Sequence, residues 1–156
     1  MALNRKCENN VTALPDEKTG VIGRVIEHDM PVIYSFDSNL PVPEMLQSLG
    51  WLAVVSWKYD GSTNNGMPPQ ELNQRMILLE SSIEEHAWGS QLYRAYGRTG
   101  NGLKELVYYT SSQETFLQGI NAALTGIPVF PINITFYADA GWEDLKRLQS
   151  DFAGKA

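Results

Sequence analysis

The chain has 156 residues, with 12 Lys and Arg against 18 Asp and Glu, which gives a formal net charge of −6. A chain of this length buries roughly 70% of its unfolded surface in one domain, so it needs no disulfide or metal ion to hold a core. The acidic balance argues against a protein that coats nucleic acid phosphates and favours a basic partner.

Residues 1–18 are polar and show no apolar period, which predicts a flexible N-terminal arm ahead of a single domain over residues 19–156. The arm contains no apolar run typical of a signal peptide, and no stretch of the chain approaches the ~20 apolar residues of a membrane helix. The single cysteine, Cys7, cannot form an internal disulfide. We therefore expect a cytoplasmic protein without a membrane segment.

Two β-type runs follow the arm and predict a hairpin. Residues 21–26 and 32–36 are rich in β-branched and aromatic side chains, and turn-forming residues at 28–31 separate them. Residues 37–50 contain two prolines and a short apolar trio. This segment predicts a connector with at most a brief helix.

The strongest patterns lie between residues 51 and 138. Apolar side chains on both faces of residues 51–59 predict a central strand. Apolar residues at alternating four- and three-residue spacing predict a long helix over residues 72–87. Strands around residues 91–96 and 103–109 flank a glycine-rich turn, so we expect them to pair antiparallel.

The remaining elements follow from capping residues and alternation. Ser111 and Glu114 form a capping box that starts a second helix, and a glycine and a proline end it. Residues 132–137 alternate in polarity and predict the last strand. Asp139 then caps a terminal helix whose apolar side begins at Trp142.

From residue 51 to residue 138 the predicted order is strand, helix, strand, strand, helix, strand, which is the split β-α-β order of ferredoxin-like folds. The sequence therefore predicts an α+β fold with a ferredoxin-like core, an N-terminal β-hairpin and a C-terminal helix. Both core helices would cover one face of the sheet. The hairpin, the terminal helix, a second subunit or a partner would cover the opposite face.

The chain offers few residues for catalysis or metal binding. A closed zinc site takes about four Cys or His ligands, whereas this sequence has Cys7, His28 and His86. It has no Gly-x-Ser-x-Gly elbow, and neither glycine-rich loop ends in the Gly-Lys-Ser/Thr of a phosphate-binding loop. We predict no catalytic residue, metal or cofactor. The alternative is a small hydrolase or nuclease that uses His28 and His86 in acid–base chemistry.

The carboxylates point to a function more clearly than the histidines do. Acidic residues group on the long helix and the terminal helix, where they form either ordinary solvated helix faces or a surface that steers a basic partner. Neighbouring aromatic side chains would anchor such a partner. The predicted partner-binding residues are Glu80, Glu84, Glu85, Trp88, Tyr96, Tyr109, Asp139, Glu143 and Asp144.

Several short motifs resemble a known family. They are Trp57-x-Tyr59, Asn65-Gly66-x-Pro68, Leu79-Glu80, Thr99-x-x-Gly102 with Lys104-Glu105-x-Val107-Tyr108-Tyr109, and Asp139-x-x-Trp142. On these residues, the stretch from about Val32 to Phe152 resembles a bacterial domain-of-unknown-function family, number six-nine-five. The resemblance implies a small α+β domain, joined in some members to a module similar to the protein inhibitor of ribonuclease E. It supplies no catalytic residues.

Small orphan families of this kind also include immunity partners of bacterial toxins, in which an acidic domain blocks a basic nuclease. By this analogy we predict a non-enzymatic binding or inhibitory protein, most concretely an immunity protein or inhibitor that occludes a basic toxin or ribonuclease. The alternatives are the His28/His86 enzyme and a homo-oligomeric scaffold such as a homodimer. Nucleic acids and membranes are not among the predicted partners.

Overall fold

A computed structural model describes residues 6–13 and 20–153 of the chain. In these ranges the elements are β1 (Lys6–Ala13), β2 (Gly20–Glu27), β3 (Met30–Asp37), α1 (Pro43–Ser48), β4 (Trp51–Lys58), α2 (Gln70–Glu85), β5 (Leu92–Gly100), β6 (Leu103–Thr110), α3 (Gln113–Ala123), β7 (Asn133–Ala138) and α4 (Glu143–Ala153). None of the helices within these ranges has the length and apolar content to cross a membrane.

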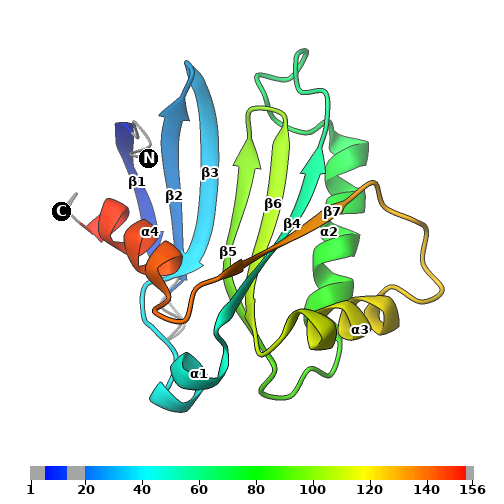
Figure 1. Ribbon diagram of the computed structural model, residues 1–156. Helices are drawn as coiled ribbons and strands as arrows, with labels where there is room; N and C mark the ends of the chain where they lie inside the picture. Colours follow the sequence, from blue (N-terminus) through cyan, green and yellow to red (C-terminus); the bar gives the residue numbers. More distant parts are fainter. Residues whose placement is uncertain (1–5, 14–19, 154–156) are drawn as a thin grey trace.

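The described strands form one sheet in the order β1-β2-β3-β5-β6-β4-β7, and every pair of neighbours is antiparallel (Figure 1). Strands β4 and β6 lie at the centre of its second half. They are the most buried strands, with a run of consecutive buried residues in each. The α+β class and the C-terminal helix are therefore confirmed.

The predicted hairpin forms from β2 and β3, and it extends the sheet instead of covering one of its faces. β3 pairs with β5 from Val32 opposite Gly100 to Phe36 opposite Tyr96. Gly100, with a φ of 149°, permits this approach because a Cβ there would collide with the backbone of Pro31 and Val32.

A strand also forms within the range predicted as a flexible arm, residues 1–18. Lys6–Ala13 make β1, which pairs antiparallel with β2. An edge strand is held by backbone N–H and C=O groups, so its pairing needs no apolar period that a sequence pattern could reveal. Residues 1–5 and 14–19 lie outside the described residues.

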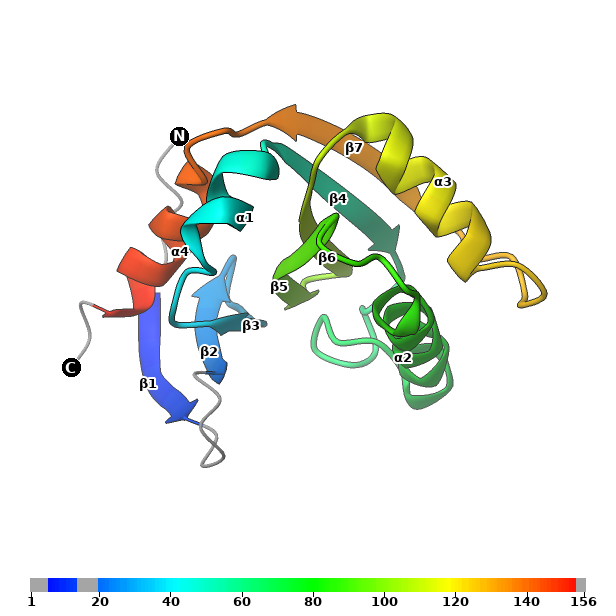
Figure 2. The same cartoon turned by 90° about the horizontal axis from the view of Figure 1, so that it is seen from below.

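Helices lie on both faces of the sheet, with α1 and α4 on the opposite side from α2 and α3 (Figure 2). The core under α2 and α3 contains Trp57, Leu79 and Phe116. On the other face, Trp142, which directly precedes α4, and Leu145 of α4 pack against β4 and β6, and the last turns of α4 pack against β2 and β3. The terminal helix is thus the element that covers part of the second face.

Helix α3 begins one residue later than the predicted capping box. Ser112 is the N-cap, and its Oγ accepts a hydrogen bond from the Thr115 backbone N–H at 3.0 Å. Ser111 instead donates to Gln91 Oε1. The Ser-x-x-Glu spacing predicted Ser111 as the N-cap, whereas Ser112 has this role. The local sequence could not indicate this, because Ser111 contacts Gln91, which is 20 residues away in the chain.

Candidate functional site

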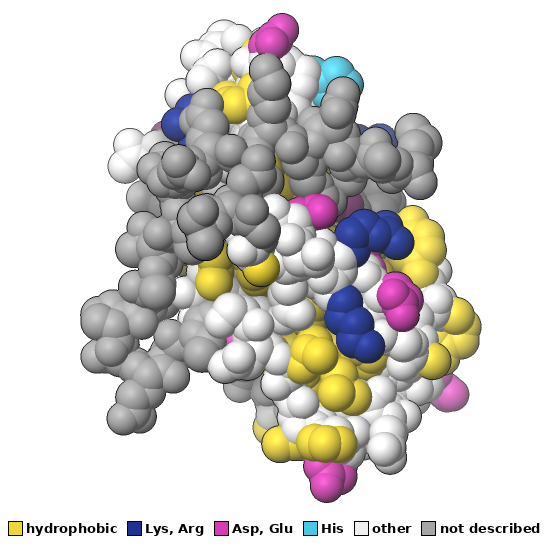
Figure 3. All heavy atoms as spheres, turned by 90° about the vertical axis from the view of Figure 1, so that its left-hand side faces the viewer, with side chains coloured by type: hydrophobic (Ala, Val, Ile, Leu, Met, Phe, Trp, Pro, Cys, Tyr) yellow, Lys and Arg dark blue, Asp and Glu magenta, His cyan; other side chains and the backbone are white. Residues whose placement is uncertain are grey.

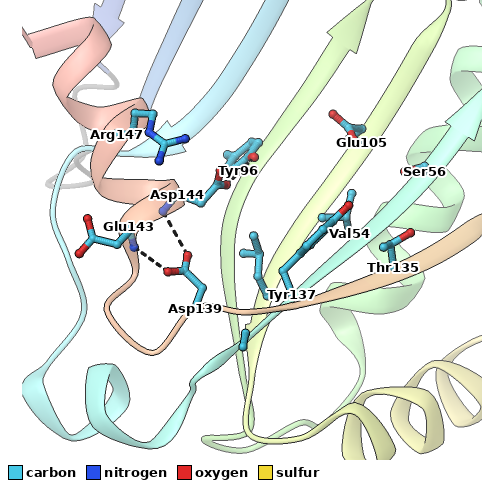
Figure 4. Close-up of a pocket in the computed structure, with 12 residues that line it drawn as sticks. Val54, Ser56, Tyr96, Glu105, Thr135, Tyr137, Asp139, Glu143, Asp144 and Arg147 are labelled. Atoms are coloured by element: carbon cyan, nitrogen blue, oxygen red, sulfur yellow. Dashed lines mark hydrogen bonds between the residues drawn. The ribbon is translucent and has the colours of Figure 1, made fainter. Parts of the chain in front are cut away.

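The sheet face that carries α4 is hollowed beside this helix into an open groove of about 440 Å³ (Figure 4). The strands form its floor and the first turns of α4 form one wall. The residues that line it are Leu52, Val54, Ser56, Tyr96, Glu105, Thr135, Tyr137, Ala138, Asp139, Glu143, Asp144 and Arg147. This groove is the candidate site.

Strand alternation decides which side chains reach the groove. Residues 53, 55 and 57 of β4 belong to the core under α2 and α3, whereas Leu52, Val54 and Ser56 face the groove. Ser56 lies opposite Glu105 on β6, and Val54 lies opposite Thr135 on β7. The floor is therefore apolar near α4 and polar further along the strands.

Asp139 connects β7 to α4 and is held by three donors. Its Oδ1 accepts from the Glu143 backbone N–H at 2.9 Å, and its Oδ2 accepts from the Asp144 backbone N–H at 3.1 Å. These contacts confirm Asp139 as the cap of α4. The Tyr109 hydroxyl donates to the same Oδ2 at 2.7 Å. All three donors are neutral, so none of these contacts pairs the carboxylate with a cation, and the group lies at the helix N-terminus, where the helix dipole favours a negative charge.

A stacked aromatic pair fixes the start of α4 against the sheet. The rings of Tyr109 and Trp142 are nearly parallel, with centroids 3.9 Å apart. Trp142 Nε1 donates to the Leu49 carbonyl at 2.9 Å, and this tryptophan has a φ of 55°, which directs the chain into the helix. Burial, followed by the hydrogen bond to Asp139, raises the pKa of Tyr109. Tyr109 therefore stays a neutral donor to Asp139.

The groove is acidic, because four carboxylates and one guanidinium are found among its lining residues. The Tyr96 hydroxyl donates to Asp144 Oδ2 at 2.7 Å. Burial raises the pKa of Glu105, and the Asp144 carboxylate adds to this effect while Arg98 opposes it. Arg98 compensates Glu105 only in part, since its Nε lies 3.9 Å from Glu105 Oε1 while its Nη2 pairs with Glu27 at 3.0 Å.

The outer face beside the groove is of mixed charge. Figure 3 views the face that carries β1 and α4, and the described side chains there include Lys or Arg next to Asp or Glu, with apolar side chains between them. This mixture agrees with the sequence of α4, in which Lys146 and Arg147 follow Glu143 and Asp144. The outer surface of α4 is therefore of mixed charge.

The acidic residues of α2 lie in a different environment. Arg94 on β5 places Nη2 3.1 Å from Glu80 Oε2 and Nε 3.6 Å from Glu84 Oε2. The Tyr108 hydroxyl also donates to Glu84 at 3.2 Å. Two of the three predicted acids on this helix are thus paired within the protein, while Glu85 is exposed.

Trp88 is half-buried and belongs to the core near the end of α2. Its Nε1 donates to the Ile83 carbonyl at 2.7 Å, and its ring stacks on Phe116 with centroids 5.6 Å apart. It also fills the space beside Gly119, where a Cβ would collide with the indole ring. These contacts give Trp88 a packing role.

The structure brings together four of the nine predicted residues in the groove: Tyr96, Asp139, Glu143 and Asp144. Tyr109 is fully buried beneath them, so it positions Asp139 and has no exposed surface with which to anchor a partner. Glu80, Glu84, Glu85 and Trp88 lie at α2 instead. The prediction missed Glu105, Tyr137 and Arg147, although the alternation of β6 and β7 could have indicated that the first two share the face of Tyr96.

The two histidines are far apart along the sheet. His28 is exposed in the turn between β2 and β3, beyond the Gly100 end of β5, whereas His86 ends α2 just before the Leu92 end of the same strand. They therefore cannot act as a joint acid–base pair. Within residues 6–13 and 20–153, no group of three or more His, Cys, Asp or Glu is arranged to hold a metal ion.

Fold and groove together define an antiparallel α+β protein with an acidic groove on one sheet face. Residues 23–146 match the family described as "Family of unknown function (DUF695)". Because this match spans most of the chain, the chain belongs to that family, which confirms the resemblance of its motifs. No curated protein and no solved structure matches the chain.

Proposed function

We propose that this protein is a non-enzymatic binding protein that takes a basic segment of another protein into the acidic groove. The observation that carries the proposal is the set of side chains in the groove, with four carboxylates and one guanidinium beside the half-exposed ring of Tyr137. Neutral donors hold Asp139 and Asp144 in place. Their charges therefore stay available to an incoming Lys or Arg.

In this proposal the groove recognises a cationic side chain, which binds between carboxylates that the protein holds in place. A Lys or Arg between Glu105 and Asp144 would exchange water for charge-assisted hydrogen bonds. Burial raises the pKa of Glu105, and an incoming cation would stabilise the charged form of this carboxylate. The ring of Tyr137 offers an apolar surface for the aliphatic part of the same side chain.

Residues 51–138 form, in this proposal, a ferredoxin-like core. The element order β4-α2-β5-β6-α3-β7 and the sheet order β5-β6-β4-β7 support it. Such a core places both of its helices on one face. The other face is then free for α4 and the groove.

The most concrete partner is a basic toxin or ribonuclease, which the protein would neutralise by occluding its surface, as an immunity protein does. The net charge of −6 supports long-range attraction to a basic protein. A cytoplasmic site of action belongs to the same proposal. The binding would be steric and electrostatic, with fast, salt-sensitive association.

A Lys-rich synthetic peptide tests the groove directly. The double variant Glu143→Gln/Asp144→Asn should bind it about tenfold more weakly than the wild type in fluorescence anisotropy at low salt, since each rim charge contributes up to ~1 kcal/mol. The matched control is Glu71→Gln/Glu114→Gln, which changes the net charge equally and removes first-turn acids from α2 and α3. It should change the affinity less than twofold.

Equal losses in the two double variants, or an affinity that does not fall with added salt, would contradict a specific acidic groove. The same pair of variants can then be used as baits in the native host. A basic protein retained by the wild type and the control but lost from the groove variant would be the partner.

A hydrolase or nuclease is the second candidate, and one observation favours it. A hollow of about 400 Å³ at the end of α2 is lined by Glu84, His86 and Arg94, which places an acid–base group next to a cation. Purified protein incubated with RNA and with chromogenic esters should show no turnover if the binding proposal holds. Turnover that His86→Ala abolishes would establish the enzyme instead.

A further inference from the structure

The outer edge of β7 carries unpaired backbone groups beside the groove. In the described sheet, β7 is the last strand and pairs with β4 on its other side (Figure 2). The Asp139 N–H donates to the Gly50 carbonyl at 2.9 Å, which makes these two residues a hydrogen-bonded pair of the antiparallel ladder. Because such pairs alternate, the N–H and C=O groups of Ile134, Phe136 and Ala138 point away from β4.

This edge has no charged side chain, no proline and no bulge within β7. Exposed edges normally carry charged side chains, prolines or bulges, which prevent pairing with another chain. The sequence of β7 is Asn-Ile-Thr-Phe-Tyr-Ala, with no charge and no proline, and its register with β4 runs without a shift. Its β-branched and aromatic residues favour an extended backbone. The edge is therefore competent to accept a further strand.

A strand added at this edge would send alternate side chains to the groove. Thr135 and Tyr137 of β7 face the groove, while Ile134 and Phe136 pack toward the core under α3. Side chains of an added strand on the groove face would lie next to Thr135 and Tyr137, within direct contact. At the C-terminal end of β7 they would reach the carboxylates of Asp139 and Glu143.

We propose that the β7 edge binds an extended basic segment of a partner protein by strand addition, with a Lys or Arg of that segment directed into the acidic groove. This inference rests on the proposed function, because the groove selects the charge, and it adds the backbone contact that would orient the segment. In strand addition the main-chain hydrogen bonds contribute affinity, and the pockets for alternate side chains contribute specificity. A second copy of this chain suits the edge less well, since antiparallel pairing of two β7 strands would place two acidic grooves on the same face.

The test uses a labelled peptide that alternates Lys with Val, and the same peptide with N-methyl groups on alternate backbone nitrogens. Ala138→Pro removes one outward N–H and leaves the pairing with β4 intact, which edge strands tolerate. The matched control Val129→Pro introduces a proline at an exposed residue outside β7. We expect Ala138→Pro to weaken binding at least tenfold, Val129→Pro to stay within twofold of the wild type, and the N-methylated peptide to bind at least tenfold more weakly.

The outcomes separate the edge from the groove. If Glu143→Gln/Asp144→Asn weakens binding while Ala138→Pro and N-methylation do not, strand addition is overturned and the groove remains. Failure of the Lys-Val peptide to bind also overturns strand addition, while the Lys-rich peptide decides on the groove separately. If sedimentation shows a wild-type dimer that Ala138→Pro dissociates, a second copy occupies the edge and the proposal is wrong. N-methylation tests the same bonds without altering the protein, so the result does not depend on the folding of Ala138→Pro.

Discussion

The acidic residues of α2 and those at the start of α4 look alike in the sequence and differ in what faces them. Above β5, Glu80 and Glu84 share the guanidinium of Arg94. At the start of α4, Asp139 and Asp144 receive their hydrogen bonds from tyrosine hydroxyls and backbone N–H groups. Glu80 and Glu84 are therefore partly neutralised by one shared cation, whereas neutral donors hold Asp139 and Asp144.

The difference teaches that the side chains of the underlying strands decide whether a helix carboxylate is paired with a cation. The face of β5 and β6 toward α2 presents Arg94 and Lys104, and burial lowers the pKa of Lys104 while Glu80 acts against that lowering. The face toward α4 presents Tyr96 and Tyr109. Counting acids on helices therefore treats Glu80 and Glu84 as available charges although both lie next to Arg94.

Among these predictions, the largest effect is a loss of stability on substitution of Asp139, which caps α4. Asp139→Ala removes the helix cap, which costs about 1 kcal/mol, and leaves the buried Tyr109 hydroxyl without its acceptor, which costs about 2 kcal/mol more. We expect urea denaturation to show a loss of about 3 kcal/mol in the free energy of unfolding. Asp139→Asn keeps one acceptor oxygen and should lose about 1 kcal/mol. Equal losses would show that Tyr109 does not depend on this carboxylate.

A smaller loss of stability should follow from substitution of Arg94, which pairs with the carboxylates of α2. Arg94→Ala leaves two partly buried carboxylates without their shared cation, and we expect a loss of about 2 kcal/mol, since the pair is only partly buried. Arg147→Ala, at the exposed rim of the groove, should change stability by less than about 0.5 kcal/mol. It should also strengthen binding of the Lys-rich peptide severalfold. Similar stability losses in both variants would remove the distinction between the two acidic groups.

The smallest expected effect is a dependence of peptide affinity on pH, which tests the acidic group beside α4. Burial raises the pKa of Glu105, so this carboxylate takes up its proton at a higher pH than an ordinary glutamate. A bound cation prefers the charged form, so affinity for the Lys-rich peptide is full above the pKa of Glu105 and falls as the pH drops through it. Glu105→Gln should abolish this early decline and lower the affinity a few-fold at neutral pH. An identical pH profile for the two proteins would exclude Glu105 from the site.

Much of the fold was predictable because its strands and helices carry strong local patterns. The alternation in residues 51–59 and the apolar spacing of α2 follow from packing against a core, and both elements form. β1 could not be predicted, because its pairing with β2 depends on backbone groups that every residue possesses. The pairing of β3 with β5 likewise joins residues that are distant in the chain. In the local sequence Gly100 is a sign of this close approach.

The candidate site was predictable only where capping chemistry is local. Asp139 was found because an acid before a helix is a cap, and Glu143 and Asp144 followed from the same first turn. Glu105 was missed because its place in the groove depends on its pairing with Ser56 across the sheet. Tyr109 was predicted as an exposed anchor, yet the stacking of Trp142 on its ring buries it. Such contacts join residues that are distant in the chain.

The packing of α4 on the hairpin has a consequence for the order in which the protein is made. Val25 and Val32 bury their side chains against Leu148 and Phe152, and Gly23 leaves room for the phenylalanine ring. The ribosome completes β2 and β3 long before it adds these α4 residues. The apolar face of the hairpin must therefore wait for almost the whole domain to emerge, and a nascent chain stalled before α4 would present that face to chaperones.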